Sequence, residues 1–246
     1  SVKELRMIGI QPNILCLRAD RPVSEELRKK IALNCHVPKE CVFNAQDVNS
    51  IYKVPLALHE QGFDQVIVDL LNIWTGAPDL NEWKLIARNI DAPEHSCRIG
   101  IIGKYVDVVD AYKSINEALI HSGIANNAKI EVEYVDSEKI TSKTVGECID
   151  RFDGVIIPGG FGNRGIEGKI QAIQYLREKK KPFFGICLGM QLAAIEFARN
   201  ELKVEGATSE EFSKDSNSKI IHLMESQHGI YRKGGTMRLG AYPCRV

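Results

Sequence analysis

The chain of 246 residues is 44% hydrophobic and 26% charged, and its formal net charge at pH 7 is zero. This length and composition are typical of a globular protein with one large or two smaller domains, and the dispersed, balanced charges give no footprint for nucleic-acid binding. No apolar run approaches the ~20 residues that a membrane span needs, and residues 1–12 lack a signal-peptide pattern, so we expect a cytoplasmic protein with no membrane partner.

The cysteine pattern argues against both a disulfide framework and a structural zinc site. The seven cysteines are odd in number, widely scattered and free of any CxxC pair, so most are expected to be reduced thiols and no metal site is predicted. They are Cys16, Cys35, Cys41, Cys97, Cys148, Cys187 and Cys244.

Residues 1–93 have the pattern of a partial α/β layer. The predicted order is strand, helix, short strand and helix, at 13–18, 24–34, 41–45 and 50–62. Ser24 is a suitable N-cap for the first helix, and Gly62 would end the second. Turn residues flank one short amphipathic helix within 75–97, so we place a domain boundary near residue 93.

Residues 94–246 alternate between strand and helix. Strands are predicted at 98–105, 129–136, 152–160 and 182–187, and helices at 108–123, 142–149, 165–179 and 189–199. Because each crossover helix covers one face of a parallel sheet, this order predicts a three-layer α/β fold with an open, mostly parallel sheet. The polar stretch 209–219 is predicted to be one long loop.

Cys187 falls at a predicted strand-to-helix joint, with Gly185 and Gly189 on either side. G-x-C-x-G is the thiol counterpart of a nucleophile elbow, where a tight turn lifts the nucleophile above the sheet. Unpaired amides at a helix N-terminus favour the thiolate, and the amide of Leu188 could donate to an oxyanion. The alternative is a buried cysteine in a Gly-rich turn, and the spacing favours the nucleophile.

A second Gly-rich stretch, IIPGGFGNRG at 156–165, also follows a predicted strand. Its free backbone amides could complete an oxyanion hole or bind an anion. Taken alone, it is equally well explained as a tight connection that needs positive φ. Its place one strand before the elbow favours the functional interpretation.

The residues alone supply no convincing base for the thiol. Only His222 and His228 follow Cys187 in the chain; His222 alternates as a strand residue in 219–225, and His228 lies in a predicted turn. For each, a core or surface position is the preferred interpretation, and the base remains the alternative. A complete catalytic triad cannot be assembled from this pattern.

Two stretches, GICLGMQ at 185–191 and PGGFGNRG at 158–165, resemble the class I glutamine amidotransferases. With three further stretches, at 103–119, 208–212 and 234–240, the chain is similar to the CTP synthase family. Residues 1–22, 29–38 and 47–62 resemble the last portion of that family's amidoligase domain. The resemblance therefore implies that residues 1–93 are the C-terminal part of an amidoligase domain together with a linker. It implies a flavodoxin-like glutaminase domain, incomplete at its C-terminus, at 94–246.

The resemblance also implies roles for the matching residues. Cys187 matches the glutaminase nucleophile, which attacks glutamine to form a glutamyl thioester and release ammonia. Glu211 matches a position that pairs with the α-amino group of glutamine. The full set implied for the oxyanion and for glutamine is Gly160, Leu188, Gly189, Met190, Gln191 and Glu211.

In the first part, Lys30 matches a residue that contacts UTP, or CTP as feedback inhibitor, and Gln46, Asp47 and Val48 match the ATP site. The family converts UTP, ATP and glutamine to CTP, ADP, phosphate and glutamate with Mg²⁺, is activated allosterically by GTP, and forms a homotetramer. Arg164 and residues 231–235 resemble the neighbourhood of the GTP site.

The departures from the family pattern predict a fragment. No GxxxxGK loop and no carboxylates framing Mg²⁺ precede residue 93, so the magnesium site is expected outside this chain. The family's catalytic His and Glu, and an Arg-His-rich segment for the glutamine carboxylate, would lie beyond residue 246. We therefore expect the chain by itself to be inactive, with Cys187 alkylated only slowly by a glutamine-like electrophile.

Two alternatives belong to other classes of protein. One is a stand-alone cysteine hydrolase or redox-stress protein of the same architecture, which would use the elbow thiol against peroxide or small electrophiles. The other is a non-catalytic scaffold that binds partners or nucleotides. The first 90 residues and the stretches at 110–114 and 234–240 disfavour the stand-alone thiol enzyme.

Overall fold

The computed structural model describes residues 1–104 and 109–224, and it has the α/β fold predicted from the sequence. The chain divides into two compact units. Unit 1 comprises residues 1–94 with 124–128, and unit 2 comprises residues 95–123 and those from 129 onward. No helix in the described ranges is long and apolar enough to cross a membrane.

Unit 1 is built on two parallel strands, β1 (Leu15–Ala19) and β2 (Val42–Gln46), with Leu15 opposite Val42. The connecting helix α2 (Glu25–Cys35) begins at Ser24, whose hydroxyl accepts from the amide of Leu27 as predicted for an N-cap. The other elements are α1 (Val2–Met7), η1 (Lys39–Cys41), η2 (Ile51–Lys53), α3 (Val54–His59), α4 (Phe63–Leu70) and α5 (Asn81–Asp91). A small buried cluster of Ala32, Val37, Cys41 and Val42 joins α2 to β2.

The helix predicted at 50–62 is divided in the structure. A 3₁₀ turn, η2, comes first, and α3 then begins with Pro55 in its first turn, where the missing N–H costs nothing. The helix ends at His59 rather than at Gly62. Gly62, with φ of 79°, instead leads into α4, a helix that the sequence pattern did not indicate.

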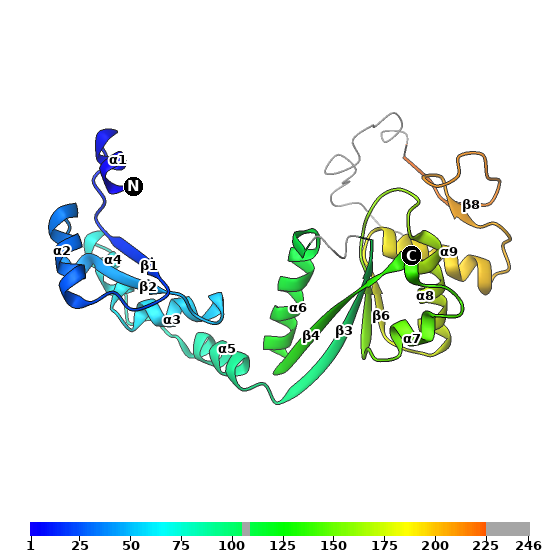
Figure 1. Cartoon of the computed structure of the whole chain (residues 1–246), viewed down its shortest axis with the longest axis horizontal. Coiled ribbons are helices and arrows are strands. Elements are labelled where there is room, and N and C mark those ends of the chain that lie inside the picture. The colour runs from blue at the N-terminus through cyan, green and yellow to red at the C-terminus, as the bar shows by residue number, and fades with distance from the viewer. Residues whose placement is uncertain (105–108, 225–246) are drawn as a thin grey trace. The chain divides into compact units, whose positions relative to one another are not determined.

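Unit 2 contains a four-stranded sheet in the order β4-β3-β5-β6. Strand β5 (Gly154–Ile157) lies parallel to both β3 (His95–Gly103) and β6 (Phe183–Gly185). Figure 1 shows α6 (Lys113–Ala125) on one side of the sheet and α7 (Val145–Ile149), α8 (Ile166–Glu178) and α9 (Leu188–Asn200) on the other. The remaining elements are η3 (Val109–Tyr112), β4 (Ala128–Asp136), η4 (Ser137–Lys139), β7 (Thr208–Ser209) and β8 (Lys219–Ile221).

The main core lies where α8 and α9 pack on β5 and β6. Ile157, Ile173, Leu176, Leu192 and Ile195 are all at most 1% exposed. Burying an aliphatic side chain of this size contributes about 1.5–3 kcal/mol. This packing fixes the carboxyl ends of β5 and β6 against each other.

Two local predictions near the end of the described chain need correction. The stretch 209–219, predicted as one loop, has a short strand at each end, because β7 pairs in parallel with β8. His222, predicted within a strand, lies one residue beyond the end of β8. The pairing stops before it, and its side chain is exposed.

Candidate active site

Cys187 forms the corner between β6 and α9, and its backbone is strained. Its φ of 52° and ψ of −107° place a residue with a side chain in a region that glycine normally occupies. Such strain costs of order 1–3 kcal/mol and persists only where the surrounding structure imposes it. The thiol side chain is exposed rather than buried beneath the sheet.

The two glycines beside Cys187 are sterically required. A Cβ at Gly189 would lie 2.0 Å from the carbonyl oxygen of Ile157, and one at Gly185 would lie 2.6 Å from the backbone of Gly189. Both distances are far below van der Waals contact, so α9 can start this close to β5 and β6 only with glycine at these positions. The G-x-C-x-G spacing is thus the spacing of a tight strand-to-helix turn.

The loop that follows β5 lies directly against this corner. A Cβ at Gly159 would lie 3.3 Å from Cβ of Cys187, and one at Gly160 would lie 3.8 Å from Cδ2 of Leu188. In the described part of the chain, the amides of Gly160 and Leu188 donate to no protein acceptor. Two free N–H groups therefore lie on the segments that flank the thiol, as an oxyanion hole requires.

Of the other residues implied for glutamine, Gly189, Met190 and Gln191 lie on the first turn of α9, and Glu211 lies beyond β7. The amide of Gly189 is used within the turn, donating to the carbonyl of Ile186 at 2.9 Å, and that of Gln191 donates to the carbonyl of Cys187 at 3.1 Å. Met190 is 55% exposed. Glu211 reaches the loop from beyond β7, and its Oε1 accepts from the amide of Gly162 at 3.1 Å.

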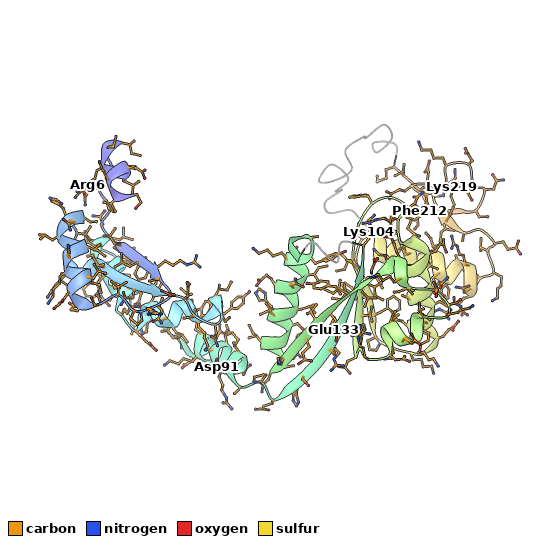
Figure 2. All side chains as sticks on the ribbon, viewed as in Figure 1. Arg6, Asp91, Lys104, Glu133, Phe212 and Lys219 are labelled. Carbon is orange, nitrogen blue, oxygen red and sulfur yellow. The ribbon has the colours of Figure 1, made fainter. Side chains whose placement is uncertain are left out.

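Sequence reasoning missed two buried cations beneath this loop. Lys169 on α8 is 1% exposed, and its Nζ donates to the carbonyl of Pro158 at 3.3 Å. Lys104, labelled in Figure 2 just beyond β3, is 8% exposed and donates to the carbonyl of Phe161. The signal for Lys169 was its position between Ile166 and Ile173, at the spacing of the buried face of α8.

Burial and neighbouring charges lower the pKa of both lysines. For Lys169 desolvation is the main cause and the charge of Lys104 adds to it, and together they lower the pKa from 10.5 to about 8. For Lys104 burial lowers the pKa, Arg164 lowers it further, and Glu211 and Glu138 oppose the change. Arg164 also donates to the carbonyl of Lys104 at 2.8 Å.

No described histidine makes a hydrogen bond with the thiol. No side chain in residues 1–104 and 109–224 makes a hydrogen bond with Sγ of Cys187. The side chain of His222 is 62% exposed, and its Nδ1 lies 3.8 Å from Oε2 of Glu210. His228 and the residues around it, including 231–240, lie outside the described residues.

Unit 1 carries a second candidate site at the carboxyl ends of β1 and β2, a groove of about 800 Å³. Gln46, Asp47 and Val48, which the family resemblance assigns to an ATP site, line this groove, whereas Lys30 is exposed on α2 and does not line it. Ligands collect beyond the carboxyl ends of parallel strands in α/β folds. The other lining residues are Arg18, Arg28, Asn44, Ala45, Ile51, Val54, Ala57, Leu58, Glu60 and Gln61.

Two residues that line the groove each have a buried polar atom with no hydrogen-bond partner among the described residues: Nε of Arg28, a donor, and Oδ1 of Asn44, an acceptor. An unpaired buried polar atom costs about 1–3 kcal/mol, so each of these atoms would be stabilised by a polar partner. By contrast, the described ranges contain no group of three or more His, Cys, Asp or Glu side chains that could hold a metal ion.

A strained, exposed thiol at a G-x-C-x-G corner beside free loop amides is the arrangement of a thiol-dependent amide-cleaving site. The family model for class-I glutamine amidotransferases matches residues 107–246, so the chain belongs to that family. The model for the CTP synthase N-terminus matches residues 1–73.

Relatives that match along the whole chain are CTP synthases. That of Geotalea uraniireducens is 53% identical over 247 aligned positions, and that of Bdellovibrio bacteriovorus is 51% identical over 249. All of this chain is covered, but only 46% and 47% of those relatives, so the chain spans about half their length. A solved structure, the glutaminase domain of Trypanosoma brucei CTPS with bound acivicin, is 39% identical over 52% of this chain and 50% of that one, with a TM-score of 0.47. The family resemblance found in the sequence is therefore confirmed.

Proposed function

We propose that residues 94–246 belong to a glutaminase domain in which Cys187 is the nucleophile. Its thiolate attacks the side-chain carbonyl carbon of glutamine, and collapse of the tetrahedral intermediate expels ammonia and leaves a glutamyl thioester. Water then hydrolyses the thioester to glutamate and restores the thiol. The observation that carries this proposal is the strained, exposed corner at Cys187 beside the loop amides.

In this proposal the amides of Gly160 and Leu188 stabilise the oxyanion of the tetrahedral intermediate. Donors placed in advance at such a position are worth about 10²–10³ in rate each. A hydrogen bond from the amide of Gly162 holds Glu211 beside the loop. We assign Glu211 the role of binding the α-amino group of glutamine. Met190 and Gln191, on the first turn of α9, complete the proposed glutamine site.

For the whole protein we propose CTP synthase activity, in which ammonia from glutamine aminates UTP at the expense of ATP. Residues 1–93 would be the C-terminal part of the amidoligase domain, which is consistent with the match at 1–73. The groove at Gln46, Asp47 and Val48 is assigned to ATP, and Lys30 to UTP or to CTP as inhibitor. Mg²⁺ as cofactor, GTP as activator, a homotetramer and a cytoplasmic location belong to the same proposal.

The glutaminase proposal is tested by labelling with the chloromethyl ketone analogue of glutamine, followed by peptide mass spectrometry. Label should appear on Cys187, and glutamine but not asparagine should slow it. The Cys187→Ala variant should lose the label, and Cys97→Ala should keep it. Cys97 is a suitable control because burial, with a further contribution from Asp153, raises the pKa of its thiol.

Labelling spread evenly over several cysteines, or labelling of Cys187 that glutamine does not slow, would contradict a glutamine site. The stand-alone thiol enzyme predicts a different pattern. Mild peroxide followed by a sulfenate trap would then modify Cys187 selectively, while glutamine would give no protection from the ketone.

The nucleotide groove is tested by calorimetry with ATP on Arg28→Met. Arg28 carries the buried, unpaired Nε, and losing a charge-assisted hydrogen bond should weaken ATP binding by about tenfold or more. Arg21→Met is the matched control, because Arg21 is an exposed residue that does not line the groove. If the unmodified chain and both variants bound ATP with equal affinity, the proposal that this groove binds ATP would be wrong.

A further inference from the structure

Three charged side chains bind the backbone of the loop from Pro158 to Gly162. Lys169 donates to the carbonyl of Pro158 at its start, and Lys104 donates to the carbonyl of Phe161 near its end. The carboxylate of Glu211 accepts from the amide of Gly162 at 3.1 Å. Charged side chains therefore fix both ends of the segment that contains Gly160.

Holding a carbonyl also orients the amide on the same peptide unit. A trans peptide is planar, and its C=O and N–H point in opposite directions. By binding the Pro158 carbonyl from the α8 side, Lys169 turns the N–H of Gly159 to the other side. Lys104 does the same for the peptide between Phe161 and Gly162. The N–H of Gly160 lies between these two fixed planes.

Packing gives no reason for a lysine at position 169. Its neighbours on the same helix face, Ile166 and Ile173, are buried and apolar. Among the described residues no carboxylate lies within 4.0 Å of the Lys169 ammonium to offset its burial. An uncompensated buried charge is costly, and such residues concentrate at functional sites.

We propose that Lys169 is a positioning residue for the proposed glutaminase site: its ammonium fixes the Pro158 carbonyl and thereby aims the Gly159–Gly160 segment at the oxyanion formed on Cys187. This inference rests on the proposed function. Lys169 does not touch glutamine or the reacting atoms. It acts through the backbone of the loop, which lies 3.3 Å from Cys187 at the position of a Gly159 Cβ.

The protonation state of Lys169 gives this role a pH dependence. With a pKa near 8, the lysine is mostly charged at pH 7 and loses its charge as the pH rises through 8. The neutral amine makes a weaker hydrogen bond to the carbonyl. Lys104 is the charged group that acts on it. The other charged or titratable groups on the elements packed against α8 are Glu138 and Lys139 of η4, Glu147 and Cys148 of α7, and Glu196 and Arg199 of α9.

The test compares two electrophiles on the same thiol over pH 6–10. With iodoacetamide the thiolate displaces iodide directly and no oxyanion forms, whereas the chloromethyl ketone analogue of glutamine presents a carbonyl oxygen to the oxyanion hole. Both reactions need the Cys187 thiolate, so the ratio of their rates does not depend on how far the thiol is ionised. The ratio therefore reports the contribution of the loop to the reaction with the ketone. In the unmodified chain the ratio of ketone to iodoacetamide rates should fall as the pH rises through about 8.

Lys169→Met should lower this ratio at pH 7 by about ten- to a hundredfold, because misplacing a catalytic group by about 1 Å costs up to about a hundredfold. It should also remove the pH step. Lys169→Arg, which retains its charge, should restore part of the ratio without the step. Ile173→Val, a buried change on the same helix, should leave both the ratio and the step unchanged.

An unchanged ratio in Lys169→Met, or a ratio in the unmodified chain that stays flat through pH 8, would overturn the role of Lys169. The second measurement needs no variant, so it decides the matter even if a substitution prevents folding. Failure of the proposed function looks different. In that case the ketone would not select Cys187 in the unmodified chain at any pH.

Discussion

Lys169 should lower the stability of unit 2 at neutral pH, so that Lys169→Met makes the protein more stable. Its pKa in the folded chain is about 8, against 10.5 for a free lysine, which corresponds to roughly 3 kcal/mol against folding while the lysine is charged. Methionine fills the same apolar space but loses the hydrogen bond to Pro158, which costs about 1 kcal/mol. The expected net gain at pH 7 is about 2 kcal/mol.

The sign of the pH dependence follows from the direction of the pKa change. Between pH 8 and 10.5 the unfolded chain binds more protons at Lys169 than the folded chain, so folding stability rises with pH in this window. The advantage of Lys169→Met should therefore shrink above pH 8. It should be close to zero at about pH 9.5, where the remaining electrostatic cost roughly equals the lost hydrogen bond.

Urea unfolding at pH 7 and pH 9.5, followed by far-UV circular dichroism, measures the effect. Trp74 and Trp83, the two tryptophans of the chain, both lie in unit 1, so their fluorescence serves as an internal reference that should not move. Ile173→Val should cost about 0.5–1.5 kcal/mol at both pH values. A loss of more than about 1 kcal/mol at pH 7 in Lys169→Met would show that Lys169 stabilises the fold, contrary to this reasoning.

Three further substitutions test the packing around the site. Arg177→Met should lower the free energy of unfolding in urea by about 3–5 kcal/mol, because it would leave Glu196 as a buried, unpaired charge. Glu196 is 1% exposed, and Arg177 donates to its carboxylate at 2.8 and 2.9 Å. A loss of less than about 1 kcal/mol would refute this expectation. Gly189→Ala should cost at least about 2 kcal/mol and slow ketone labelling, since its Cβ would meet the Ile157 carbonyl, and an unchanged melting temperature would count against the tight corner. Cys187→Gly should be about 1 kcal/mol more stable than Cys187→Ala, because glycine relieves the strain at φ 52°; the reverse order would exclude a strained elbow.

The sequence predicted the sheet of unit 2 well because strand and helix segments alternate along this part of the chain. β5 and β6 fall within the predicted ranges, whereas β4 begins one residue and β3 three residues before the predicted start. The elbow was also predictable, because the spacing of Gly185, Cys187 and Gly189 reflects a steric requirement that the structure contains. Both are cases where local pattern and tertiary packing agree.

The misses have different physical causes. The short helices α1 and α4 are too brief for periodicity to distinguish them from loops, and the pairing of β7 with β8 depends on contacts that no local pattern records. Lys169 and Lys104 were not predicted as site residues, because their role depends on which backbone carbonyls they bind. That arrangement is a property of the folded loop, and nothing in the PGGFG stretch itself encodes it.

In the proposed mechanism, backbone amides receive the negative charge that forms when Cys187 attacks glutamine. The decisive measurement is a crystal structure of the chain after reaction with the chloromethyl ketone analogue of glutamine. The adduct should be on Cys187, with its carbonyl-derived oxygen within about 3.1 Å of the amides of Gly160 and Leu188. An adduct oxygen that points to solvent, away from both amides, would contradict the claim.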